Sequence, residues 1–301
     1  MMHSSAPAST VIWLGEKSGA DPLVVGPKAA HLSLLAGQFR VPPGFCLSAD
    51  TYRRAGIPAR VSPGLRNTIT GAYSRLADIC GVSAPRVAVR SSAVDEDGPL
   101  ASFAGQHETL LNIVGVDALV DAIEHSWMSA HTEQALSYRS RHGLAIDGIG
   151  LAVLVQHLVV ADVAGVMFSA NPVNGRRNEL VVSASWGLGE SIVGGTVTPD
   201  SWIVSRQGLQ ILDEQIGDKR MMTVAVGGGT QEVEVPRVMR DRPSLSVAQI
   251  QEVALLGTRL EEVKGWPVDI EFAISAGTLY LLQCRPITTL GQEMLTLNQT
   301  I

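Results

Sequence analysis

Four ionised or amide side chains interrupt a largely apolar stretch at residues 268–287. Alternation with a period of two predicts a β-hairpin there, with its turn at residues 275–278. The first strand then carries two carboxylates on one face, and the second carries an amide and a guanidinium on one face: Asp269 and Glu271, then Gln283 and Arg285. Burying such groups is costly without partners, and together they suit a divalent cation and a polyphosphate. The alternative is a hairpin with one wetted face and an internal Glu–Arg pair.

Composition indicates a globular protein. Of 301 residues, 46% are hydrophobic and 17% are charged, which allows one large domain or two ordinary ones. The net charge of −6 and the absence of a basic run argue against nucleic-acid binding. Three dispersed cysteines form no metal-binding or disulfide pattern, which fits a cytoplasmic protein.

No membrane association is expected. The first ten residues lack the cationic start and long apolar core of a signal peptide. The most apolar stretch, residues 148–168, is interrupted by Gln156, His157 and Asp162, and reads better as two buried strands than as a spanning helix.

Helical and strand patterns are mixed without regular βαβ alternation, which predicts an α+β fold with at least one antiparallel sheet. Helical periodicity covers residues 27–38, 65–80, 117–130, 132–142 and 247–263, the last preceded by the candidate caps Ser244 and Ser246. Strand patterns cover residues 86–90, 109–114, 151–160, 164–169, 180–185, 201–205, 268–274 and 279–284.

A lysine lies near the start of the first predicted helix. Gly26 permits a tight backbone, and Pro27 suits a first helical position. Lys28 would oppose the helix dipole unless an anion such as phosphate lies beside it. The alternative is an ordinary exposed lysine in a first turn.

An arginine is predicted at the end of a buried strand. Arg90 is followed by Ser91 and Ser92, by the acidic residues 95–97, and by small residues at 101–105 that permit close backbone approach. An arginine so placed can hold a phosphate through two hydrogen bonds. The alternative is that Arg90 pairs with the acidic residues and only orders their loop.

Two further segments could contact a ligand. Gln156 and His157 form a polar pair in a buried strand, either a hinge facing a purine edge or a simple strand bend. The glycine-rich residues 184–195 lack a dinucleotide motif and suit a flap, with Glu190 contacting a ribose or a metal. The alternative for this flap is a loop packed on Trp186.

Together these segments resemble the ATP-binding domain of the pyruvate phosphate dikinase, phosphoenolpyruvate synthase and rifampicin phosphotransferase family. The matching stretches are residues 25–35, 41–45 (VPPGF), 89–92 (VRSS), 102–106 (SFAGQ), 165–172 (GVMFSANP), 186–190 (WGLGE), 269–271 (DIE) and 283–287 (QCRPI). The resemblance implies an ATP-grasp fold, with two lobes and ATP in the cleft between them. We expect this domain at residues 1–290, with lobes of about 1–110 and 111–290, and a peripheral tail at 291–301.

The resemblance also assigns roles by position. Lys28 and Arg90 correspond to phosphate-contacting residues, Glu271 and Gln283 to Mg²⁺ ligands, and Arg285 to the arginine that steadies the transferring phosphates. The segment Gln156, His157, Leu158 and Val159 corresponds to the adenine-facing residues. Lys28, Arg90 and Arg285 would be the catalytic residues. One departure is Pro27, where the family usually has glycine, because proline removes a backbone donor from this loop.

The family's full enzymes continue into a domain with a phosphorylated histidine, in a Thr-Ser-His or Thr-Cys-His setting. None of the seven histidines in this sequence has that setting. The leading hypothesis is therefore a dikinase-type transferase subunit that binds Mg-ATP. It would pass phosphate to a histidine on a separate carrier, which would also hold the acceptor-substrate domain. The alternatives are a non-catalytic ATP-binding regulatory module and an ATP-grasp ligase that forms an acyl phosphate.

Overall fold

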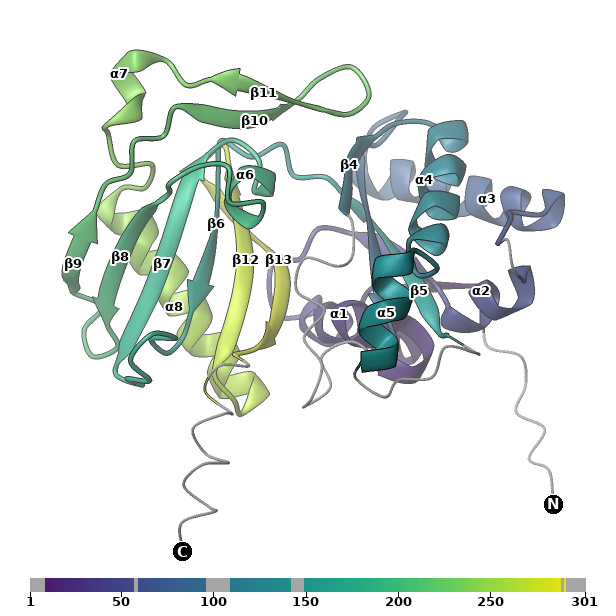
Figure 1. The fold of residues 1–301 in the computed structure, drawn as a ribbon, viewed down its shortest axis with the longest axis horizontal. Coiled ribbons are helices and arrows are strands. Elements are labelled where there is room, and N and C mark those ends of the chain that lie inside the picture. Colours follow the sequence, from purple (N-terminus) through teal and green to yellow (C-terminus); the bar gives the residue numbers. More distant parts are fainter. Residues whose placement is uncertain (1–8, 57–58, 96–108, 142–148, 288–289, 291–301) are drawn as a thin grey trace, which may run out of the picture. The chain divides into compact units, whose positions relative to one another are not determined.

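The computed structural model describes residues 9–56, 59–95, 109–141, 149–287 and 290 (Figure 1). The chain forms two compact units. Unit 1 comprises residues 1–158 with 226–229, and unit 2 comprises residues 159–225 with 230–301. The chain therefore first passes from one unit to the other after Leu158, later than the lobe boundary expected near residue 110.

Unit 1 is built on a five-stranded sheet in the order β1-β2-β5-β3-β4, and every neighbouring pair is antiparallel. Its strands are β1 (Val11–Trp13), β2 (Gly44–Leu47), β3 (Val87–Ala93), β4 (Thr109–Ile113) and β5 (Leu151–His157). Its helices are the 3-10 helix η1 (Lys17–Ala20), α1 (Pro22–Leu35), α2 (Ala49–Ala55), α3 (Pro63–Cys80), α4 (Val116–Ser129) and α5 (Glu133–Arg141). Because β4 pairs with β3 and α4 packs on β3, β4 and β5, the chain beyond residue 110 stays in this unit.

Different helices cover the two faces of this sheet. Val87 and Val89 of β3 join a buried apolar cluster that includes Ile69 of α3 and Trp127 of α4. Side chains alternate along a strand, so Ser92 points to the opposite face, where it contacts α1. The sheet thus lies between α1 on one face and α3 with α4 on the other.

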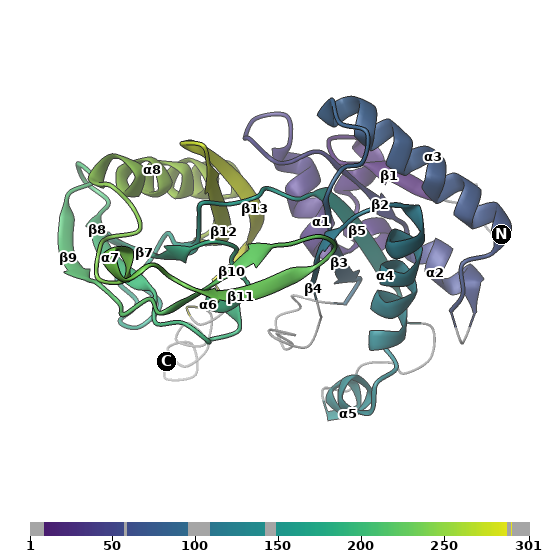
Figure 2. The same ribbon diagram turned by 90° about the horizontal axis from the view of Figure 1, so that it is seen from above.

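Unit 2 is built on a six-stranded antiparallel sheet in the order β13-β12-β6-β7-β8-β9, with a separate two-stranded hairpin, β10–β11. Its strands are β6 (Val163–Phe168), β7 (Glu179–Trp186), β8 (Asp200–Ser205), β9 (Ile211–Gln215), β10 (Met221–Ala225), β11 (Thr230–Glu234), β12 (Val268–Ser275) and β13 (Thr278–Pro286). Its helices are α6 (Glu190–Val193), α7 (Arg237–Arg240) and α8 (Val247–Lys264). Figure 2 shows α8 running along one face of the larger sheet, where it packs on β12, β6 and β7.

The long helix of unit 2 begins at a sequence-encoded cap. The Ser246 hydroxyl accepts from the Gln249 backbone N–H at 3.3 Å, and the Gln249 side chain accepts from the Ser246 N–H at 2.9 Å. This capping box satisfies donors that a helix start otherwise leaves without partners. On the sheet side, Gly257 leaves room for Met167 of β6, whose side chain would overlap any Cβ at position 257.

A buried ion pair joins three segments of unit 2. Lys219 and Asp200 are both fully buried, and their side chains form a salt bridge. The Gly217 N–H donates to Asp200 Oδ1 at 2.9 Å, and both the N–H and the hydroxyl of Ser244 donate to Asp200 Oδ2 at 2.7 Å. Ser244, the other expected helix cap, therefore serves this carboxylate instead.

The α+β prediction is confirmed, and each predicted helix is present, as α1, α3, α4, α5 and α8. Each predicted strand is also present, as β3 to β8, β12 and β13. The elements that were not predicted are β1, β2, β9, β10, β11, η1, α2, α6 and α7. Several are only three or four residues long, and β9 and β11 are largely exposed and charged, so their hydrophobic period is weak. Within the described part of the chain, no helix is long and apolar enough to cross a membrane.

Candidate functional site

The lysine segment is held against β3 by a glycine. Gly26 interrupts α1 with φ 74° and ψ 158°, and the helix resumes at Pro27, the position expected from the sequence. A Cβ on Gly26 would overlap the carbonyl and hydroxyl oxygens of Ser92 and lie 2.7 Å from its carbonyl carbon. The Ala29 N–H, at 3.4 Å from Ser92 Oγ, adds a weak hydrogen bond. Both the backbone conformation and the close approach therefore require glycine, and they fix the half-buried Lys28 relative to β3.

Arg90 lies inside β3, which corrects the expectation that it ends the strand. The strand continues to Ala93, because residues 91–93 pair with residues 151–153 of β5. Arg90 pairs with Leu154 and is half-buried. Since Arg90 and Ser92 are two residues apart, both side chains point to the face that α1 covers.

The segment expected to face adenine ends β5 and leads out of unit 1. Gln156 lies across from Ala88, on the same face as Arg90, and its Nε2 donates to the carbonyl of Pro42 at 3.1 Å. The sheet thus brings Gln156 and Arg90 to the face covered by the helix that carries Lys28.

His157 points to the opposite face of the sheet. Burial lowers the pKa of its imidazole, which favours the neutral ring. The N–H groups of His157 and Leu158 already donate to the carbonyls of Pro43 and Arg86, both at 2.8 Å. A purine contact through those two N–H groups would therefore break existing bonds. Val159, the last residue of the segment, begins unit 2.

The acidic residue that follows β3 has a partner other than Arg90. Both terminal nitrogens of Arg139 on α5 donate to the carboxylate of Asp95. The observed partner of Asp95 is thus Arg139 of α5. The other candidates for pairing with Arg90, Glu96 and Asp97, lie outside the described residues, as does the matching stretch 102–106. Sequence reasoning missed Arg139, because a contact across 44 positions leaves no local pattern.

The C-terminal hairpin is confirmed, and its polar residues meet across the two strands. Asp269 lies directly across from Arg285, and Glu271 across from Gln283. Arg285 Nε donates to Asp269 Oδ2 at 2.8 Å, and the Asp269 side chain is only 9% exposed. The recorded ion pair inside the hairpin is thus Asp269–Arg285, where the sequence had suggested Glu–Arg. Glu271 and Gln283 form a neighbouring pair of oxygen-bearing side chains.

These polar residues lie on the face of the sheet away from α8. Met167, which contacts α8 at Gly257, pairs with Ile270, and Ile270 pairs with Cys284. That face is apolar, and burial raises the pKa of the Cys284 thiol to about 12. Since side chains alternate, Glu271 and Gln283 point the other way.

The hairpin pair fits a magnesium ion that is shared with a phosphate. Glu271 is half-buried and Gln283 is 7% exposed, so both are partly shielded from water. Among the residues that the structure describes, no group of three or more His, Cys, Asp or Glu side chains could hold a metal. Mg²⁺ in nucleotide sites commonly takes one or two protein oxygens and fills its other positions with phosphate oxygens and water. The donor set on the hairpin is consistent with that kind of site.

The glycine-rich loop after β7 is tied down by hydrogen bonds. The Gly187 N–H donates to the Asp162 carbonyl at 2.9 Å, and the Leu188 N–H donates to the Thr223 carbonyl of β10 at 2.8 Å. A Cβ on Gly187 would overlap that same carbonyl oxygen. These contacts favour the packed loop over the flap. Glu190 follows as the first residue of α6, which packs against β10.

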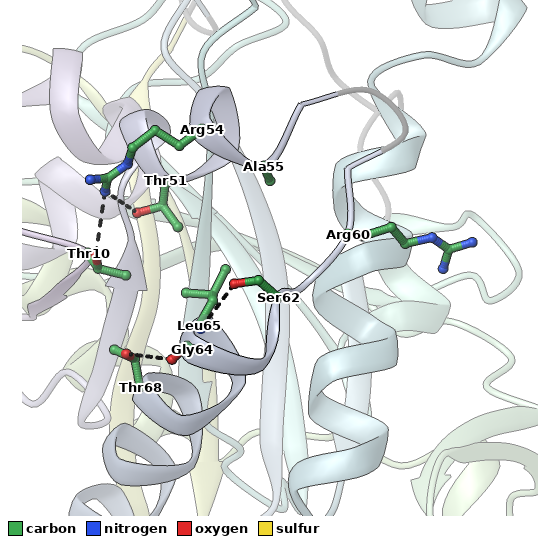
Figure 3. A pocket seen from close by; sticks show the side chains of 9 residues that line it. All are labelled: Thr10, Thr51, Arg54, Ala55, Arg60, Ser62, Gly64, Leu65 and Thr68. Atoms are coloured by element: carbon green, nitrogen blue, oxygen red, sulfur yellow. Dashed lines mark hydrogen bonds between the residues drawn. The ribbon is translucent and has the colours of Figure 1, made fainter.

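Unit 1 also contains a cavity of ≈370 Å³ at the start of α3 (Figure 3). None of the predicted site residues lines it. Its polar groups are engaged with their neighbours: Thr68 donates to the Gly64 carbonyl at 3.2 Å, and Ser62 Oγ accepts from the Leu65 N–H at 3.3 Å. Arg60 binds Glu124 at 2.6 Å. The cavity therefore lies apart from the predicted site and shows no built ligand site of its own.

Comparison with known proteins identifies the family. The family model described as "Pyruvate phosphate dikinase, AMP/ATP-binding domain" matches residues 56–300. A probable phosphoenolpyruvate synthase of Methanocaldococcus jannaschii is 39% identical over 93% of this chain and 27% of its own length. A rifampicin phosphotransferase of Streptomyces sviceus is 37% identical over 93% of this chain and 36% of its own length. The D-alanyl-alanine synthetase A structure from Vibrio cholerae covers 92% of this chain and 63% of its own, with 14% identity and a TM-score of 0.35.

The chain belongs to the pyruvate phosphate dikinase AMP/ATP-binding domain family. The resemblance inferred from the motifs is thereby confirmed, and the ATP-grasp fold remains the expectation that this resemblance carries. The chain spans about a third or less of the length of the synthase and phosphotransferase named above.

Proposed function

We propose that this protein binds Mg-ATP and transfers a phosphoryl group to a histidine on a separate carrier domain or protein. The residues proposed to act are Lys28 and Arg90 of unit 1, and Glu271, Gln283 and Arg285 of unit 2. The observation that carries the proposal is the register of the C-terminal hairpin, which sets Glu271 beside Gln283 and Asp269 beside Arg285.

The hairpin supports a metal-phosphate site for electrostatic reasons. The Asp269–Arg285 pair neutralises a buried carboxylate and holds the guanidinium by its Nε atom. An arginine fixed in this way can direct its terminal nitrogens to phosphate oxygens without reorganising. Glu271 then adds a negative charge, which Mg²⁺ would offset, and the neutral amide oxygen of Gln283 would supply a second ligand.

Unit 1 supports phosphate binding on the α1 face of its sheet. Lys28 lies in the first turn after Gly26, where helix N–H groups and the dipole favour an anion. Pro27 removes one of those N–H donors, so the lysine charge and the remaining N–H groups would hold the phosphate. Arg90 lies on the same face and would supply a second cation.

Transfer of a phosphoryl group requires alignment and charge neutralisation more than covalent chemistry by the enzyme. In such reactions the transferring group is loosely bonded, and its charge spreads over its oxygens. Lys28, Arg90 and Arg285 would offset that charge, and Mg²⁺, when bound, supplies further neutralisation. No nucleophile from this chain is needed, because the acceptor histidine attacks directly.

The relatives support the proposal of a carrier domain. They are named phosphoenolpyruvate synthases and a rifampicin phosphotransferase, and this chain corresponds to only part of each. The resemblance places their acceptor histidine in another domain, so we propose that this chain works with such a domain. Its three free cysteines and its use of ATP agree with a cytoplasmic location.

A non-catalytic ATP-binding module is the second candidate. One observation favours it: Pro27 removes a backbone donor from the phosphate loop. Such a module would bind ATP without transfer.

Labelled ATP distinguishes the two candidates. The purified chain is incubated with magnesium and ATP labelled at the β or the γ position, with and without the proteins encoded beside it. We expect acid-labile label on a histidine of one of these proteins. Binding of ATP without hydrolysis or transfer would instead support the regulatory module.

The Glu271→Gln variant provides the control for that experiment. It keeps the size of the side chain and removes the charge that would bind the metal. Label transfer at the wild-type rate in this variant would contradict the assignment of Glu271.

A further inference from the structure

A partly buried ion pair lies next to the strand that carries Arg90. Arg139 on α5 is 5% exposed, and its Nη1 donates to Asp95 Oδ1 at 3.1 Å while its Nη2 contacts Oδ2. The Asp95 side chain is 30% exposed. A guanidinium that binds both oxygens of one carboxylate fixes distance and orientation together, which a single ammonium cannot do.

Asp95 lies where β3 leaves the sheet. The preceding residue, Val94, donates its N–H to the Gly150 carbonyl at 2.9 Å, and β3 itself ends at Ala93. The backbone is therefore anchored at Val94 by a main-chain bond and at Asp95 by Arg139. These two anchors determine the path of the chain at the end of this strand.

The same end of β3 packs against the lysine segment. The backbone of Ser92 approaches Gly26 so closely that no Cβ fits there, and its hydroxyl lies 3.4 Å from the Ala29 N–H. Ser92 is three residues before Asp95, and Arg90 is five residues before it. A shift of this strand end would therefore move Ser92 against α1 and disturb Lys28 and Arg90 together.

We propose that Arg139 is a positioning residue for the phosphate-binding groups of unit 1. It acts through Asp95, which holds the end of β3 in the register that seats Ser92 against Gly26. This inference rests on the proposed function, since it assumes that Lys28 and Arg90 contact phosphates.

A simpler role for the pair is attachment of α5 to unit 1. The Tyr52 hydroxyl lies 2.5 Å from Nε2 of His131, so the chain just before α5 has a polar contact of its own. If the pair only attaches α5, its loss would lower the stability of the protein and would weaken the binding of ATP and AMP equally. Loss of positioning would weaken ATP more than AMP, because the lysine and arginine act on the polyphosphate.

The test compares the binding of ATP and AMP, each with magnesium, by calorimetry. The variants are Arg139→Ala, Arg139→Lys and Asp95→Asn, and Arg141→Ala is the control, since Arg141 is exposed on the same helix. We expect Arg139→Ala to weaken ATP binding about tenfold or more, because small misplacements of binding groups are costly. AMP binding should change less than about twofold, since positioning acts on the polyphosphate. Arg141→Ala should match the wild type for both ligands.

Arg139→Lys provides the second criterion. Lysine keeps the charge but cannot form both hydrogen bonds, so we expect a loss close to that of Arg139→Ala. Wild-type ATP binding in either Arg139 variant would overturn the inference, as would equal losses for ATP and AMP. If Arg139→Ala does not fold, Arg139→Lys and Asp95→Asn decide the question by the same criteria. A wild-type chain that binds no ATP would overturn the proposed function and this inference together.

Discussion

Substituting Gly26 by alanine tests the packing that positions Lys28. Alanine at φ 74° and ψ 158° would occupy a backbone region that essentially only glycine adopts, which costs about 1–3 kcal/mol. Its Cβ would also overlap Ser92, with 2.7 Å to the carbonyl carbon, and such overpacking costs about 1–3 kcal/mol. The lower conformational entropy of the unfolded alanine chain offsets about 0.4–1 kcal/mol of these costs. The net expectation is a loss of about 1–6 kcal/mol in the free energy of unfolding.

Two other glycines separate the cost of the backbone conformation from the cost of the overlap with Ser92. Gly81 has φ +67° and no atom within 4 Å of a built Cβ, so Gly81→Ala should show only the backbone cost. Gly71 lies inside α3 with open space, and Gly71→Ala should stabilise by about 0.5–1 kcal/mol. Urea unfolding measures all three variants, and calorimetry measures ATP binding by Gly26→Ala, which should be weakened about tenfold or more. If Gly26→Ala is no less stable than Gly81→Ala, the close approach to Ser92 is refuted.

Three further predictions concern unit 2. Glu271→Gln should reduce label transfer about 10²–10³-fold and leave the thermal unfolding midpoint nearly unchanged, as removal of a charge at the reacting centre does; an unaltered rate at saturating magnesium would contradict it. Lys219→Met should cost about 3–5 kcal/mol in urea unfolding, because it leaves the fully buried Asp200 carboxylate without its cation. The hydrogen bond from Arg176 holds the pKa of Glu179 below its ordinary value, so its contribution to stability is present above pH 4.5 and lost as the pH falls through the folded pKa. Thermal unfolding across this range should therefore depend more steeply on pH in the wild type than in Glu179→Gln; parallel curves would exclude this contribution.

Local patterns in the sequence predicted much of the fold. The hairpin at residues 268–287 could be predicted because its apolar and polar residues alternate with a period of two and its turn contains glycine. The start of α8 could be predicted from the sequence because the capping box lies within four residues. The short or exposed strands β1, β9 and β11 were missed, because backbone pairing with neighbours stabilises them more than any apolar period of their own.

The sequence by itself determined which residue types are available for the chemistry and on which face of each strand they lie. It placed Glu271 and Gln283 on one face, and a lysine directly after a glycine–proline turn. Only the tertiary structure decided how those residues are engaged. It paired Arg285 with Asp269, paired Asp95 with Arg139, and seated Ser92 against Gly26. Strand alternation and helix capping depend on neighbours a few positions away, whereas a buried charge takes its partner from whichever segment the folded chain brings beside it.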